Sequence, residues 1–127
     1  MPDGTILLVE DDESARYILA AVLHHAGYAV VTARTATEGL ALFAEISPAL
    51  VLVDLGLPDF DGIELIRRIR GAPSGRTIPV IVVTVHAFEE DRRSAAEAGS
   101  DHFLKKPVAP AELLRSVETF LRPAASR

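Results

Sequence analysis

Ionisable side chains directly follow several short apolar runs of this sequence, and their types and spacing suggest chemistry. Asp54 ends the apolar run 49–53, which lies between Pro48 and Gly56 and is typical of a strand buried on both faces of a parallel sheet. A carboxylate at the carboxyl end of such a strand lies where open α/β folds bind their ligands. We therefore interpret Asp54 as a nucleophile that accepts a phosphoryl group.

A second group of acids follows the apolar run 6–9 and begins with Glu10 and Asp11. If the two runs are neighbouring strands, three carboxylates meet at one edge of the sheet and repel one another, so they need a cation. An oxygen-only site with positions left for water suits Mg²⁺, and Mn²⁺ or Ca²⁺ could substitute. The ion would neutralise an incoming phosphoryl group while Asp54 attacks it.

Two further residues at strand ends could assist this reaction. Thr84 follows the apolar run 78–83 with a hydroxyl that can donate to a phosphoryl oxygen, and Lys106 follows the run 101–105 with a positive charge. Lys106 precedes Pro107, and a cis peptide bond there would aim the lysine inward.

The elements that must position these residues alternate regularly along the chain. Apolar runs predict strands near 6–9, 29–31, 49–53 and 78–83, and we expect a fifth strand over 101–105. Apolar residues at helical spacing predict a helix after each strand. Ser14 is a candidate cap of the first helix, Thr35 or Thr37 starts the second, and Pro110 opens the last. This alternation predicts a single α/β domain with a doubly wound five-stranded parallel sheet, five helices and the flavodoxin-like strand order 2-1-3-4-5.

The fourth predicted helix, near residues 88–98, has only alanines as its apolar stripe apart from Phe88. It should therefore bury little surface, and we expect it to be weakly held and mobile.

The composition narrows the function classes. The chain has 127 residues, 49% of them hydrophobic, and a formal net charge of −5, which indicates one globular domain and argues against direct nucleic-acid binding. It has no cysteine, and it has no apolar stretch of membrane-spanning length. We expect a cytoplasmic protein that does not interact with membranes.

Taken together, the motifs resemble those of the response-regulator receiver family of two-component signalling. The resemblance covers nearly the whole chain and is carried by separate motifs in the expected order: Glu10, Asp11, Asp54, Leu57, Pro58, Asp61, Gly62, Thr84, Lys106 and Pro107.

The resemblance implies a phosphorylation site with a defined chemistry. A sensor histidine kinase or a histidine phosphotransfer protein would donate phosphate to Asp54 in the presence of Mg²⁺. Asp11, Asp54 and the Gly56 carbonyl would contact the metal, and Glu10 would reach it through water. Asp12 would lie outside the metal ligands, and both Asp12 and Asp61 are better explained as helix caps.

The resemblance also implies a readout. Thr84 would move toward the phosphate and Phe103 would turn inward, which would change the surface formed by the fourth helix, the fifth strand and the fifth helix. Phe103 stands where the family often has tyrosine, and Val85 stands where it usually has a small residue, so Val85 could restrict access to the site. By analogy, Gly56 and His86 flank the path of water to the phosphoryl group and could set its lifetime.

Three alternatives remain open at this point. A Mg²⁺-dependent phosphatase of the haloacid dehalogenase type also uses an aspartate nucleophile, but it needs an acid two residues later, where this chain has Gly56. Nucleotide or flavin binding would need glycines in the loop after the first strand, where this chain has acids. A receiver that acts only by docking would not need the complete set of acids, threonine and lysine.

We expect the receiver domain to occupy residues 1–122, and residues 123–127 to form a tail or the start of a linker to a missing output domain. We therefore expect a signalling domain rather than an enzyme, with only self-phosphorylation and autodephosphorylation chemistry. Its downstream partner would be another protein or the missing output domain, and a phosphorylation-dependent homodimer is a further option that the family implies.

Overall fold

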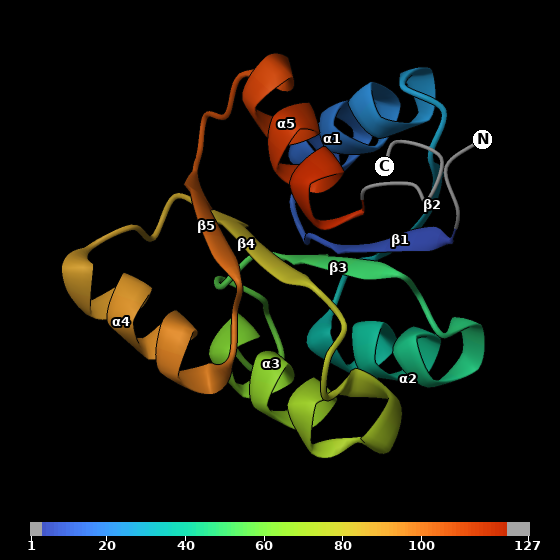
Figure 1. Cartoon of the computed structure of the whole chain (residues 1–127). Coiled ribbons are helices and arrows are strands. Elements are labelled where there is room, and N and C mark those ends of the chain that lie inside the picture. Colours follow the sequence, from blue (N-terminus) through green and yellow to red (C-terminus); the bar gives the residue numbers. More distant parts are fainter. Residues whose placement is uncertain (1–3, 122–127) are drawn as a thin grey trace.

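A computed structural model describes residues 4–121 and shows a parallel sheet with helices on both faces (Figure 1). The strand order is β2-β1-β3-β4-β5, and each neighbouring pair is parallel, as the sequence predicted. The strands are β1 (Thr5–Val9), β2 (Ala29–Ala33), β3 (Leu50–Val53), β4 (Val80–Thr84) and β5 (His102–Lys105).

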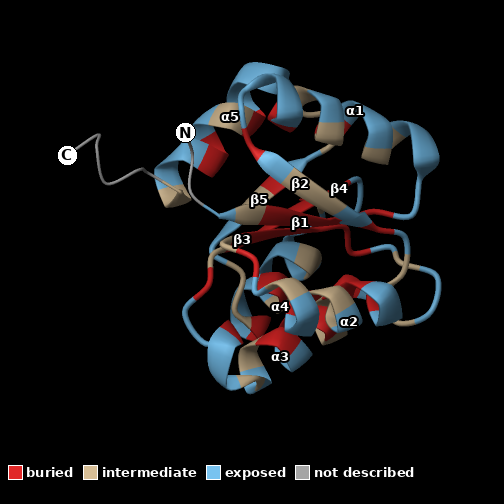
Figure 2. Cartoon of the chain, turned by 90° about the vertical axis from the view of Figure 1, so that its right-hand side faces the viewer, coloured by how far each residue is buried: buried red, intermediate tan, exposed pale blue. Residues whose placement is uncertain are grey.

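The helices form two layers on opposite sides of the sheet. Helices α1 and α5 cover one face, and α2, α3 and α4 cover the other (Figures 1 and 2). Their bounds are α1 (Glu13–His25), α2 (Ala36–Ile46), α3 (Gly62–Gly71), α4 (Glu89–Ala98) and α5 (Pro110–Phe120), with a short 3-10 turn η1 (Pro73–Gly75) after α3.

The hydrophobic core is divided by the sheet into two parts. Successive residues of β1 alternate between them: Ile6 and Leu8 pack beneath α1 and α5, and Leu7 and Val9 pack beneath α2, α3 and α4. All of β3 is buried, which explains why its sequence is an unbroken apolar run. Burial of each of these side chains is worth about 1.5–3 kcal/mol, so slippage of a central strand would be costly.

The register of the central strands fixes the edge where the acids lie. Val9 pairs with Val53, and Val53 pairs with Val82. The residues that follow β1, β3 and β4 therefore leave the sheet side by side at its carboxyl edge.

Local sequence signals account for most helix starts. Asp61 caps α3 by accepting a hydrogen bond from the Glu64 N–H at 2.9 Å, Thr35 caps α2, and Pro110 is the first residue of α5. Of the two residues that the sequence offered as caps of α1, Ser14 lies inside the helix. Asp12 is the cap, and its carboxylate accepts from the Ala15 N–H at 2.8 Å.

Helix α4 is anchored mainly at its C-terminal end. Only Ala95 and Ala98 of this helix are buried, while Phe88, the residue just before the helix, is 81% exposed. At the other end, the Arg70 guanidinium from α3 donates to the Gly99 carbonyl at 2.7 Å and to the Asp101 carboxylate at 2.9 Å. The small buried surface agrees with the expectation of a weakly held helix, and its mobility stays a prediction.

Candidate functional site

Backbone hydrogen bonds continue the sheet ladder past the strand ends and fix the candidate residues in place. The Glu10 N–H donates to the Ala33 carbonyl at 2.9 Å, and the Asp54 N–H donates to the Val9 carbonyl at 3.0 Å. The Lys106 N–H likewise donates to the Thr84 carbonyl at 2.9 Å. The positions of these residues are thus set by the sheet and not by flexible loops.

The loop after β3 is held tightly against the start of α3. A Cβ atom on Gly62 would lie only 2.4 Å from the Asp54 carbonyl oxygen, so only glycine fits at this position. The Gly62 N–H donates to the Leu55 carbonyl at 2.9 Å, which closes the turn that follows Asp54. The sequence motif Asp61-Gly62 is therefore explained by helix capping and close backbone approach.

Lys106 connects the two acidic strand ends. Its ammonium donates to a carboxylate oxygen of Glu10 and, at 3.1 Å, to Oδ2 of Asp54. Its side chain is only 16% exposed, so the lysine points into the site, and the peptide bond to Pro107 is cis. The sequence analysis had raised a cis bond here only as an option that would aim the lysine inward.

Three carboxylates converge as the sequence predicted. One oxygen from each of Glu10, Asp11 and Asp54 lies within 4.8 Å of the others. Glu10 is 1% exposed and Asp54 is 7% exposed, whereas Asp11 lies open to solvent. The carboxylate of Asp12 caps α1, which confirms its expected role as a helix cap.

The surroundings of the two buried acids, Glu10 and Asp54, shift their pKa values in opposite directions. Burial raises the pKa of Glu10 to about 7, and the charge of Asp54 adds to this effect, although the ammonium of Lys106 opposes it. Burial would also raise the pKa of Asp54, but hydrogen bonds from the Thr84 hydroxyl and the Gly56 N–H, together with Lys106, outweigh burial and lower it. Asp54 is therefore the acid that stays ionised, as a carboxylate nucleophile must.

Lys106 also stays charged. Burial acts to lower its pKa, but its hydrogen bond to Glu10 and the charge of Asp54 raise it above its usual value. The ammonium can thus serve as a fixed positive charge in the site.

Thr84 is fully buried beside Asp54. Its hydroxyl oxygen accepts from the His86 N–H at 3.2 Å, and the hydroxyl acts to lower the pKa of Asp54. The His86 ring packs against Gly56, since a Cβ on Gly56 would lie 2.8 Å from Nε2 of His86. Val85 is 61% exposed and lines an apolar groove beside Lys106.

Phe103 lies in β5, on the face of the sheet covered by α4. Its ring is half-buried and packs against the core beneath that helix, and the Arg92 guanidinium lies 4.6 Å from the ring centroid. The sequence analysis singled out Phe103 but missed Arg92. Nothing in the spacing of these two residues along the chain indicates the contact.

Two other residues near the site were also missed. The Asp59 carboxylate accepts from the N–H groups of Ala36 and Thr37 at 2.9 and 2.7 Å, which ties the loop after Asp54 to the start of α2. The hydroxyl and N–H groups at the start of α2 hold the pKa of Asp59 well below its usual value.

The second missed residue is Arg16 of α1, which donates to the carbonyl oxygens of Glu10 and Asp11 at 3.0 and 3.3 Å.

Comparison with known proteins identifies this arrangement. Residues 6–118 match the response regulator receiver domain. The chain belongs to this family. It is thus a receiver domain of the kind found in two-component response regulators, and no enzyme family is evident.

The relatives include both short and long proteins. The chain is 42% identical over 115 residues to an uncharacterized 14.6 kDa protein in the sodA1 3′ region of Leptolyngbya boryana, covering 91% of this chain and 88% of that protein. It is 39% identical to the KDP operon transcriptional regulatory protein KdpE of Escherichia coli, covering 92% of this chain but only 51% of the regulator. The receiver thus spans about half the length of such regulators.

A solved structure gives a parallel for the acidic cluster. The receiver domain of the sensor histidine kinase PA1611 of Pseudomonas aeruginosa is 31% identical, with a TM-score of 0.88, covering 94% of this chain and 98% of that one. That structure has a magnesium ion coordinated in its active site cleft. In this receiver, the carboxylates of Glu10, Asp11 and Asp54 form an oxygen donor set that can hold a divalent cation.

None of the helices within residues 4–121 is long and apolar enough to cross a bilayer.

Asp11 and Asp12 provide a matched test of cation binding. At about ten times its dissociation constant, Mg²⁺ should raise the free energy of unfolding of the wild-type receiver by ~1.4 kcal/mol. Asp11→Asn should lose this increase, because it removes one of the three converging carboxylates. Asp12→Asn should keep the increase, since asparagine also caps helices well.

Urea unfolding with Mg²⁺ and with EDTA measures the effect. Equal stabilisation of the wild type and Asp11→Asn would contradict the assignment of the site.

Proposed function

We propose that this receiver is a phosphoacceptor switch in which Asp54 takes a phosphoryl group from a histidine kinase or a histidine phosphotransfer protein. The proposal is carried by one observation, the Lys106 ammonium held between the carboxylates of Glu10 and Asp54. A purely structural lysine would neutralise one acid, whereas this site keeps further acids next to it. The surplus of negative charge is what a site for a cation and a phosphoryl group requires.

The residues at this edge of the sheet fit Mg²⁺, with Mn²⁺ or Ca²⁺ as substitutes. Asp11, Asp54 and the Gly56 carbonyl would hold the ion, and Glu10 would reach it through water. When bound, the ion supplies positive charge that offsets the negative charge of the phosphoryl oxygens.

The chain's own residues then have separate roles. An Asp54 carboxylate oxygen forms a bond to phosphorus as the bond between the donor's histidine nitrogen and phosphorus breaks, which gives an acyl phosphate. Lys106 would exchange its contact with Asp54 for one with a phosphoryl oxygen. The buried Thr84 hydroxyl would donate to a second phosphoryl oxygen.

The donor is expected to approach over an apolar groove next to the site. Ile18, Val85 and Pro107 line this groove together with Lys106, and the first two are 58% and 61% exposed. Exposed apolar side chains around a reactive centre suit a partner protein more than a small substrate. In this position Val85 would contact the docked donor protein and would also restrict access to Asp54.

The readout would involve the surface formed by α4, β5 and α5. Movement of Thr84 toward the phosphate would leave space for Phe103 to turn inward, and the ring would have to leave its contact with Arg92. Because α4 buries little surface, it can shift at modest cost. The receiver would thereby act on a downstream protein, on an output domain, or on a second copy of itself.

The domain boundaries belong to the same proposal. The receiver would extend to residue 122, and residues 123–127, which lie outside the described residues, would be a tail or the beginning of a linker. A cytoplasmic location without direct contact to nucleic acid or membrane is also part of the proposal.

A small-molecule phosphodonor tests the proposed reaction. With acetyl phosphate and Mg²⁺, the wild-type receiver should gain the mass of one phosphoryl group, because Asp54 alone among the acids of residues 4–121 combines burial, a lowered pKa and contact with Lys106. Asp54→Asn should gain none. Asp61→Asn should be phosphorylated like the wild type, because the Asp61 side chain only caps α3.

Intact-protein mass spectrometry measures the outcome, and EDTA serves as the metal-free control. Phosphorylation of a folded Asp54→Asn variant, or none of a folded wild type, would refute the proposal.

His86 provides a test of the lifetime of the phosphoryl group. Because its ring packs against Gly56, His86→Ala should open a path for water and speed loss of phosphate by about threefold or more. His24→Ala, at the exposed end of α1, should leave the rate unchanged. The measurement is the decay of purified phosphoprotein, and equal rates for wild type and His86→Ala would remove the histidine from the proposed mechanism.

A further inference from the structure

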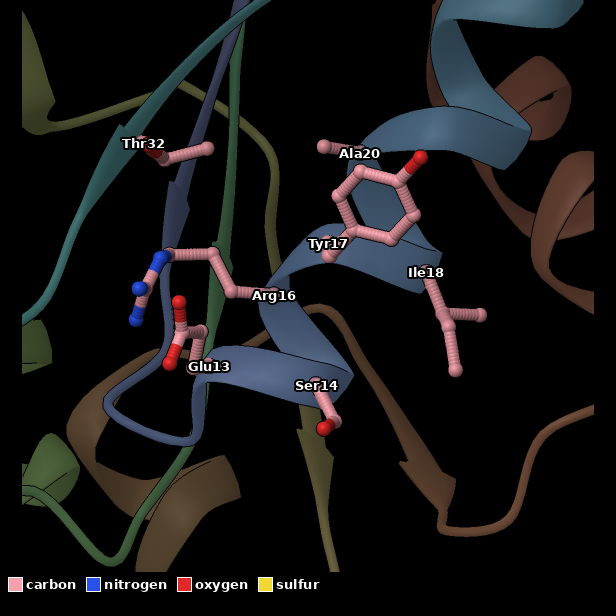
Figure 3. A pocket seen from close by; sticks show the side chains of 7 residues that line it. All are labelled: Glu13, Ser14, Arg16, Tyr17, Ile18, Ala20 and Thr32. Atoms are coloured by element: carbon pink, nitrogen blue, oxygen red, sulfur yellow. The ribbon is translucent and has the colours of Figure 1, made fainter.

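Arg16 lies in α1, but its side chain reaches back to the loop that carries two of the three acids. Figure 3 shows it extending toward the end of β1, whereas Tyr17 and Ile18 extend in other directions. Its Nη1 donates to the Glu10 carbonyl at 3.0 Å and to the Asp11 carbonyl at 3.3 Å. One guanidinium group therefore holds two consecutive peptide units of the β1–α1 loop.

Glu10 is also fixed by several other contacts. Its N–H donates to the Ala33 carbonyl, and its carboxylate accepts from Lys106 and from the Asp12 N–H at 3.1 Å. Arg16 is therefore one of several restraints on this residue.

Asp11 is fixed through its backbone and not through its own side chain. Its side chain is exposed, and among residues 4–121 no hydrogen bond to its carboxylate is formed. The peptide unit that follows Asp11 is held from two sides, because Arg16 donates to its carbonyl and the Glu10 carboxylate accepts from its N–H. Arg16 also holds the preceding carbonyl, that of Glu10, so its guanidinium contacts the peptide units on both sides of Asp11 and helps to form the cluster before a cation arrives.

The position and the charge of Arg16 act in opposite directions on cation binding. A positive charge near three carboxylates repels a cation, so charge alone predicts tighter binding when Arg16 is removed. Loss of the two charge-assisted hydrogen bonds frees the loop, so positioning alone predicts weaker binding. The sign of the change in affinity therefore distinguishes the two effects.

We propose that Arg16 is a positioning residue of the cation site, which holds the Glu10–Asp11 backbone so that the Asp11 carboxylate faces those of Glu10 and Asp54. This inference rests on the proposed function, because it assigns the cluster to a divalent cation. It adds a residue from outside the acidic cluster to the machinery of the site.

Titration of the full chain with Mg²⁺, without a phosphodonor, tests the inference by calorimetry. Arg16→Ala should weaken binding about tenfold, which corresponds to ~1.4 kcal/mol. Arg16→Lys should recover part of the affinity, because an ammonium can still donate to one of the two carbonyls. Arg115→Ala removes an exposed positive charge from α5 and should leave the affinity unchanged.

A second readout separates positioning from a general loss of structure. In the reaction with acetyl phosphate, Arg16→Ala should raise the Mg²⁺ concentration needed for half-maximal rate but reach nearly the wild-type rate at saturating Mg²⁺. Urea unfolding in EDTA reports whether each variant is folded. If Arg16→Ala does not fold, Arg16→Gln, which keeps a neutral donor, takes its place with the same expectation of weaker binding.

The outcomes are distinct. Unchanged or tighter Mg²⁺ binding by a folded Arg16 variant would overturn this inference while leaving the proposed function intact. Failure of the folded wild type to bind Mg²⁺ would instead overturn the assignment of the cluster itself.

Discussion

Electrostatic repulsion between carboxylates is the constraint on which the rest of this receiver depends. The sheet ladder brings Glu10 and Asp54 to neighbouring strand ends, and the buried valines beneath them prevent the strands from moving apart. Two unit charges about 4 Å apart repel by roughly 4 kcal/mol at an effective dielectric near 20. Lys106 offsets part of this repulsion. The repulsion that remains favours the binding of additional positive charge at the site.

This constraint explains why the two buried acids differ. Burial raises the pKa of Glu10 to about 7, whereas Asp54 receives enough hydrogen bonds to keep its pKa low. The nucleophile and its neighbouring acid are both carboxylic acids. Their pKa values differ because the balance between burial and hydrogen-bond donors differs at the two positions. The arrangement is costly for stability and useful only if the charge is neutralised during function, which connects the fold to the proposed phosphoryl transfer.

Much of the fold and part of the site follow from the sequence, because strong local signals agree with one another. The apolar runs that end in Glu10, Asp54 and Thr84 predict both the strands and their common edge, since parallel strands present all their carboxyl ends together. Two errors or omissions show where this reasoning ends. The sequence offered both Ser14 and Asp12 as caps of α1, which are equally good by type, and only the geometry of the short β1–α1 loop selects Asp12. The contact between Arg92 and Phe103 depends on how α4 lies on the sheet, which the alanines of this helix specify only weakly.

The central claim is that the carboxylate of residue 54 itself carries the phosphoryl group as an acyl phosphate. Borohydride reduces an acyl phosphate to an alcohol, so treatment of the phosphorylated receiver should convert Asp54 to homoserine, which peptide mass spectrometry can locate. We expect homoserine at position 54 and an unmodified aspartate at positions 11, 12, 59 and 61. Homoserine at another position, or phosphate that is stable to borohydride and located on a hydroxyl group or a histidine, would contradict it.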